Sequence, residues 1–185
     1  MLPFKFISVS KNIQGVFKVM KVYKSVQEFR EYIDAHQTWG QVPVYMTSGG
    51  FDPLHVGHLR CILATVDMAE KDGGYVAIIV NGDGFLERKK GKPFMRAAER
   101  AEIIAGIRGV DAAIIWDDGG QTVTGAIAKL RPNFFTKGGD RAAPEDIPEW
   151  NICQEVGCEV IFNVGGGKVQ SSSWLIEEAE KNAKD

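Results

Sequence analysis

The chain has 185 residues, a formal net charge of −2 and a hydrophobic content of 44%. This length fits one domain with its own core, and the near-neutral charge argues against a nucleic-acid partner. No apolar run reaches the roughly 18 residues of a membrane span, and the basic start lacks the pattern of a signal peptide. The three cysteines are an odd number and include no CxxC pair, so they indicate neither a disulfide framework nor a structural zinc site. They are expected to be reduced thiols in a reducing compartment. We therefore expect a cytoplasmic protein with no membrane partner.

The first elements in chain order are an extension and a helix. Residues 1–21 contain lysines but no acidic residue, and we expect them to form a flexible N-terminal extension. Residues 22–185 are expected to form the domain itself. Ser25 has the pattern of an N-cap, because Glu28 follows three residues later and apolar positions then recur at helical spacing. This capping box predicts an amphipathic helix that precedes the sheet.

Strand and helix patterns alternate through the rest of the chain. Apolar, β-branched runs predict five strands, at residues 42–50, 75–83, 110–118, 132–140 and 157–164. Helical periodicity follows the first three strands, at residues 56–71, 97–109 and 122–130, and a last helix is expected over 171–184. Such alternation predicts an α/β fold, a Rossmann-like three-layer α/β/α sandwich with a mostly parallel five-stranded sheet. Ligands bind at the carboxyl ends of strands in such sheets, so the segments 47–58, 137–141 and 165–173 should converge on one site.

The first of these segments, GGFDPLHVGHLR, contains two of the three histidines, His55 and His58. Gly49 and Gly50 allow a sharp turn close to a ligand, and the free N–H groups of the following helix suit a phosphate. Two imidazoles over one helical turn could stabilise negative charge on a phosphoryl group. The alternatives are a metal pair or a capping histidine. We expect no metal ligands, because a third strong ligand is missing nearby.

These residues carry a resemblance to a known superfamily. HVGH preceded by GGFDPL resembles the (H/T)xGH signature of the nucleotidyltransferases that include cytidylyltransferases and adenylyltransferases. NGDGFLERKKGKPFMRAAERAEIIAGIRGVD is similar to the strand end, basic loop and helix of the heptose 1-phosphate adenylyltransferase domain of the bifunctional enzyme for ADP-heptose synthesis. LRPNFFTKGGD matches the LRP…KGGD segment of that family. The resemblance covers about residues 22 to 180, and glycerol-3-phosphate cytidylyltransferase shares the same signature elements.

The resemblance implies an enzyme in which a phosphate oxygen of a sugar phosphate attacks the α-phosphorus of a nucleoside triphosphate and releases pyrophosphate. The implied catalytic residues are His55, His58 and a lysine of the basic loop, Lys90 or Lys89. The implied nucleotide-binding residues are Gly50, Phe51, Asp52, Lys89, Lys137, Asp140, Ser171, Ser172 and Ser173. We favour a turn-forming role for Asp52 over a role as a base, because aspartate before proline is common in turns.

Several positions qualify the resemblance. The family often has an aromatic residue where this chain has Arg141, which puts base stacking there in question. The family's glycine before its serines is replaced, because Val169 and Gln170 precede Ser171. Arg100 falls where the family also has an arginine, and the alternative is an exposed cation on a helix.

The implied partners are a nucleoside triphosphate, bound with Mg²⁺, and a phosphorylated sugar or polyol acceptor, as in lipopolysaccharide precursor metabolism. ATP is favoured over CTP. Homodimers are common in the superfamily, so a homodimer is an expectation here too. The alternative functions are a glycerol-3-phosphate-type cytidylyltransferase, a nucleotide-binding module without catalysis, and a metal-dependent hydrolase built on the two histidines.

Overall fold

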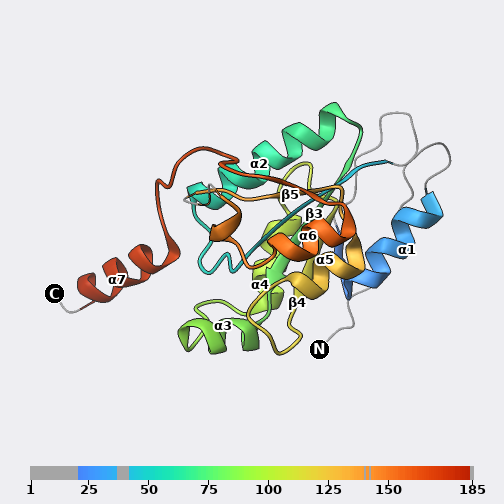
Figure 1. Ribbon diagram of the computed structural model, residues 1–185. Coiled ribbons are helices and arrows are strands. Elements are labelled where there is room, and N and C mark those ends of the chain that lie inside the picture. The colour runs from blue at the N-terminus through green and yellow to red at the C-terminus, as the bar shows by residue number, and fades with distance from the viewer. Residues whose placement is uncertain (1–20, 37–41, 140, 142, 184–185) are drawn as a thin grey trace.

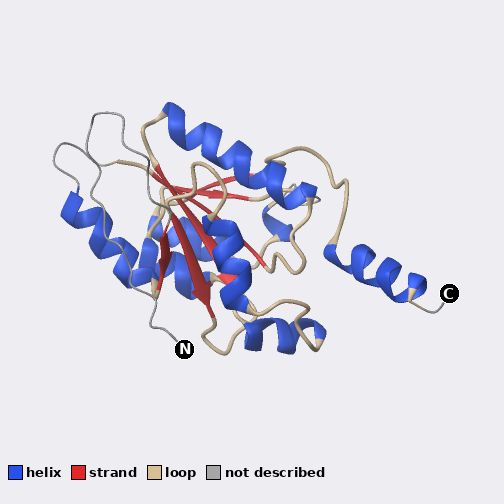
Figure 2. Ribbon diagram, turned by 180° about the vertical axis from the view of Figure 1, so that it is seen from behind, coloured by secondary structure: helices blue, strands red, loops and turns tan. Residues whose placement is uncertain are grey.

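The computed structural model describes residues 21–36, 42–139, 141 and 143–183. The predicted N-terminal extension, apart from Lys21, and Asp140 lie outside these residues. Within them, six strands form one parallel sheet in the order β1-β4-β3-β2-β5-β6. Helices cover both faces of this sheet (Figures 1 and 2). The fold is therefore the predicted Rossmann-like three-layer α/β/α sandwich.

The strands alternate with helices in chain order. The strands are β1 (Lys21–Tyr23), β2 (Val44–Gly49), β3 (Tyr75–Asn81), β4 (Ala112–Trp116), β5 (Phe134–Thr136) and β6 (Glu159–Ile161). The helices are α1 (Val26–His36), α2 (Val56–Lys71), α3 (Asp83–Lys90), α4 (Ala97–Ala105), α5 (Thr124–Leu130), α6 (Trp150–Val156) and α7 (Ser172–Asn182), with a short 3₁₀ turn at Pro144–Asp146. The capping box before α1 is confirmed, since the Glu28 N–H donates to Ser25 Oγ at 3.1 Å.

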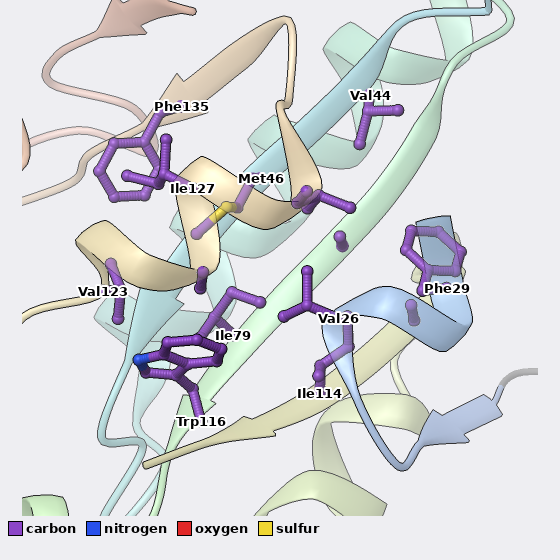
Figure 3. Packing of buried hydrophobic residues seen from close by; sticks show 14 of the residues in the cluster. Val26, Phe29, Val44, Met46, Ile79, Ile114, Trp116, Val123, Ile127 and Phe135 are labelled. Carbon is purple, nitrogen blue, oxygen red and sulfur yellow. The ribbon is translucent and has the colours of Figure 1, made fainter. Parts of the chain in front are cut away.

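The sheet buries one hydrophobic cluster on each face. On one face, α1, α5 and α6 cover a cluster that includes Phe29, Met46, Ile114 and Phe135 (Figure 3). On the other face, α2 and α4 cover a cluster that includes Ile78. All seven residues of β3 are buried, as expected for a parallel strand covered on both sides. These two cores fix the strand ends from which the polar segments emerge.

The structure differs from the sequence prediction in three elements. A sixth strand, β1, pairs with β4 at the sheet edge, and its three residues are too short to show a period. The basic run predicted as a loop is helical up to Lys90, because Phe85 and Leu86 are buried and hold α3 against the domain. The short helix α6, which precedes β6, was also not predicted.

The last helix, α7, extends away from the body of the domain (Figure 1). Among the residues that the structure describes, no helix has the length and apolar character needed to cross a bilayer.

Candidate functional site

A cleft of ≈ 370 Å³ opens at the carboxyl ends of the strands. All three polar segments line it: the turn and first helical residues after β2, the KGG segment after β5, and the glycine- and serine-rich segment before α7. The convergence expected from the order of strands is therefore present. The site is built where the parallel topology gathers the ends of β2, β3 and β5.

Two histidines form the first wall of the cleft. His55 is the N-cap of α2, and its Nδ1 accepts hydrogen bonds from the backbone N–H groups of Gly57 at 3.1 Å and His58 at 3.4 Å. The capping alternative is thus correct for His55. Because Nδ1 accepts, the imidazole proton of neutral His55 sits on Nε2. The rings of His55 and His58 stack with centroids 3.7 Å apart.

Burial favours the neutral form of both imidazoles. Burial, reinforced by the charges of His55 and Lys90, lowers the pKa of His58 to about 4. Burial also lowers the pKa of His55. The rings of Phe51 and His58 pack in a T-shaped arrangement, with centroids 5.1 Å apart. Phe51 takes a left-handed φ of 51°, unusual for a bulky residue, so the turn that carries it is strained.

Asp52 anchors the segment that follows α3. Its buried carboxylate accepts hydrogen bonds from the backbone N–H groups of Phe94 at 2.8 Å and Met95 at 2.6 Å. The Lys90 ammonium lies 2.8 Å from Asp52 Oδ2 and donates to the Asp52 carbonyl oxygen at 2.9 Å. Burial acts to raise the pKa of Asp52, but these donors outweigh it and hold the pKa below its ordinary value. Asp52 thus links the turn after β2 to the segment before α4, and its predicted role in forming that turn stays a prediction.

The two lysines of the basic run therefore differ in position. Lys89 lines the cleft, whereas Lys90 is paired with Asp52. The catalytic role assigned to Lys90 stays a prediction, and it would require the ammonium to leave this carboxylate.

Arg100 is buried, so the alternative of an exposed helix cation was wrong. Its guanidinium donates to the carbonyl oxygens of Gly50 at 2.7 Å, Asn81 at 2.6 Å and Met95 at 2.9 Å. It also pairs with Asp83 at 2.7 Å. Arg100 thus ties the turn after β2 to the end of β3 and to the start of α4. Arg100 therefore holds the turn after β2 in place but does not itself line the cleft.

The segment after β5 places Lys137 in the cleft. Its Nζ lies 3.4 Å from Glu149 Oε2 and 4.4 Å from the centroid of the Phe135 ring. Burial lowers the pKa of Lys137, and the Glu149 carboxylate acts in the opposite direction. Arg141 also lines the cleft. Asp140, predicted to bind the nucleotide, lies outside the described residues.

The three serines differ in what they contact. Ser171 caps α7, since its Oγ accepts from the Trp174 N–H at 3.3 Å. Ser172 Oγ donates to the Pro53 carbonyl oxygen at 2.9 Å, which joins the start of α7 to the turn before the histidines. Both residues line the cleft. Ser173 is exposed, and its hydroxyl lies 3.0 Å from that of Ser171.

Residues outside the recognised motifs also line the cleft, among them Gln121 and Glu149. Gln121 follows β4, so the rule that ligands bind at strand ends could have found it. Glu149 lies just before α6 and reaches the cleft only because the chain folds back after β5. No local sequence pattern marks it.

Comparison with known proteins agrees with this geometry. Residues 46–170 match the family model described as cytidylyltransferase-like. The bifunctional protein HldE of Geotalea uraniireducens is 33% identical over 77% of this chain and 26% of its own length. The protein of the same name from Syntrophotalea carbinolica is 30% identical over 76% of this chain and 26% of its own length. The matched region thus spans about a quarter of these relatives.

A solved structure shares the fold. The lipopolysaccharide core biosynthesis protein from Thermoplasma volcanium superposes with a TM-score of 0.51 and 22% identity. The superposition covers 70% of this chain and 97% of that one. The family match extends from β2 to the residue before the α7 cap and includes the paired histidines. The chain therefore belongs to the cytidylyltransferase-like family of nucleotidyltransferases.

Proposed function

We propose that the protein transfers a nucleoside monophosphate from a nucleoside triphosphate, with ATP favoured, to a sugar phosphate such as heptose 1-phosphate. An oxygen of the acceptor phosphate forms a new bond to the α-phosphorus. The bond from that phosphorus to the bridging oxygen of the β-phosphate breaks, and pyrophosphate leaves with the bond's electrons. No covalent enzyme intermediate and no general base are needed, because the acceptor phosphate is already an anion.

The observation that carries the proposal is the stacked histidine pair at the start of α2, in a cleft shared with Lys137 and the α7 cap. His55 has its proton on Nε2, so it can donate a hydrogen bond to an oxygen of the reacting phosphate. Neutral imidazoles stabilise developing charge by donation and do not need to gain a proton. The first turn of α2 adds the positive end of the helix dipole, while its N–H groups at Gly57 and His58 donate to His55 Nδ1 and hold that ring in place.

The substrate would arrive as its magnesium complex, in which the metal neutralises charge between phosphates. The geometry favours phosphate over a zinc ion between the histidines. The rings stack face to face, and His55 Nδ1 is occupied by two backbone donors. Two ring nitrogens that bound one ion would have to point at a common position instead.

The test is a matrix of the four nucleoside triphosphates against sugar, polyol and amino-alcohol phosphates, read by pyrophosphate release. We expect turnover with ATP and heptose 1-phosphate, and its loss in His58→Ala with the circular dichroism spectrum retained. Turnover with CTP and glycerol 3-phosphate would instead support the alternative cytidylyltransferase. A matrix without turnover, together with nucleotide binding, would support a module that binds without catalysis. Undiminished turnover by folded His58→Ala would contradict the proposed roles.

A further inference from the structure

Glu149 is a buried acidic side chain in a cleft that basic side chains, including Lys137, also line. It lies just before α6, lines the cleft and is 4% exposed. Its Oε1 accepts a hydrogen bond from the Val123 N–H at 3.3 Å. Its Oε2 lies 3.4 Å from Lys137 Nζ and accepts no hydrogen bond from the residues described in the structure. A buried carboxylate oxygen without a donor is unfavourable, so this position favours a ligand that donates one.

The charges of the pair restrict the chemistry of that ligand. A phosphate placed here would be repelled by Glu149, and its attraction to Lys137 is already offset by the same carboxylate. An amine would be attracted to Glu149 but repelled by the Lys137 ammonium. A neutral group avoids both conflicts. Hydroxyl groups fit best, because one hydroxyl can donate to the carboxylate while a neighbouring oxygen accepts from the ammonium.

We propose that Glu149 and Lys137 form a subsite for a vicinal diol and so select hydroxylated over deoxygenated substrates. This inference rests on the proposed function, which supplies two sources of such a diol: the ribose of the nucleoside triphosphate and the ring of the sugar phosphate acceptor. The Oε2 atom accepts a hydrogen bond from one hydroxyl, and Lys137 Nζ donates to the adjacent oxygen. A substrate that lacks the hydroxyl leaves the buried Oε2 atom without a hydrogen-bond donor, which is the basis of discrimination against it.

The variant that isolates this interaction is Glu149→Gln. Glutamine keeps the side-chain length and an oxygen for the Val123 N–H, but it removes the negative charge that faces Lys137. Glu145→Gln is the matched control, because Glu145 is an exposed acid in the adjacent 3₁₀ turn. Lys137→Gln tests the other partner and also serves if Glu149→Gln does not fold. Thermal melting of each purified variant checks the fold before binding is measured.

Two binding titrations distinguish the sources of the diol. The first compares the magnesium complexes of ATP, 2′-deoxyATP and 3′-deoxyATP. If the ribose occupies the subsite, the wild type prefers ATP over at least one deoxy analogue by about tenfold, and Glu149→Gln loses that preference. The second titrates heptose 1-phosphate and glycerol 3-phosphate in the presence of a non-hydrolysable ATP analogue. If the acceptor occupies the subsite, its affinity falls about tenfold in Glu149→Gln and the preference for ATP over its deoxy analogues is unchanged.

The outcomes separate this proposal from the proposed function. Neither titration requires turnover, so a protein that binds a diol through Glu149 but never releases pyrophosphate would refute the transferase and retain the subsite. If Glu149→Gln changes neither the preference for ATP nor the affinity for the acceptors by more than about twofold, the diol subsite is refuted. An equal effect of Glu145→Gln would also overturn it, because the loss would then reflect general charge in the cleft.

Discussion

The neutral state of His58 makes stability depend on pH in a way that can be calculated. Burial at the start of α2, beside Phe51, lowers the pKa of His58 from 6.5 to about 4. In the unfolded chain the same imidazole returns to its ordinary value. Between these two values the unfolded state binds a proton that the folded state does not. Acid therefore favours unfolding, and the free energy of unfolding falls as the pH falls from 6.5 towards 4.

The magnitude follows from the two proton-binding equilibria. At pH 7 His58 is neutral in the folded protein and mostly neutral in the unfolded chain, so its contribution is small. At pH 5 the unfolded imidazole is protonated and the folded one is not, which lowers the free energy of unfolding by about 2 kcal/mol. Over the whole range from pH 6.5 to pH 4, the decrease in the free energy of unfolding approaches about 3 kcal/mol.

Urea unfolding followed by circular dichroism, at a series of pH values from 7 to 5, measures this effect. In His58→Gln the titrating group is absent, so the free energy of unfolding should fall less steeply with acid than in the wild type. His36→Gln is the control, because His36 is the exposed histidine at the end of α1. It reports the effect of replacing a histidine outside the cleft. Parallel curves for wild type and His58→Gln would refute the assignment of a buried, neutral His58.

Three further substitutions test the framework of the site. Arg100→Met removes the donor shared by Gly50, Asn81 and Asp83, so it should lower the free energy of unfolding by about 3 kcal/mol and abolish nucleotide binding. An unchanged midpoint of urea unfolding would contradict this expectation. Asp52→Asn removes the ion pair with Lys90 and should lower the free energy of unfolding by about 2 kcal/mol. Proteolysis between α3 and α4 should become faster, and an unchanged cleavage pattern would contradict the role of Asp52 in holding this segment. Gly57→Ala places a methyl group 3.1 Å from the His55 ring, so turnover should fall about tenfold while the melting temperature is nearly unchanged. Full activity of this variant would show that the position of the ring is not critical.

The order of strands and helices could be predicted from local pattern. Five of the six strands and the helix after each of the first three of them follow from hydrophobic periodicity, because a buried parallel strand and an amphipathic helix leave different periods in the sequence. The missed elements are short or polar. β1 has three residues, and α3 is held by the burial of Phe85 and Leu86 rather than by a regular apolar stripe. β1 is too short to show a period, and the eight residues of α3 include too few apolar ones to form a stripe.

The residue types of the site could also be predicted, since glycine turns, histidines and serine caps act through their own backbone and nearest neighbours. His55 and Ser171 cap the helices that follow them, and both are recognisable as local motifs. What each charged side chain contacts could not be predicted. Lys90 and Lys89 are adjacent in the sequence, yet one pairs with Asp52 and the other lines the cleft.

The sequence by itself determined the parallel α/β fold, the family signature and the three segments that line the cleft, because each depends on period or on local spacing. Only the tertiary structure decided the partners of Arg100 and the pairing of Lys137 with Glu149. Those contacts join residues from different strands and helices, and their strength depends on burial. Burial is a property of the packed domain. The sequence alone therefore did not show that the charged side chains of Arg100 and Glu149 are buried and support the site.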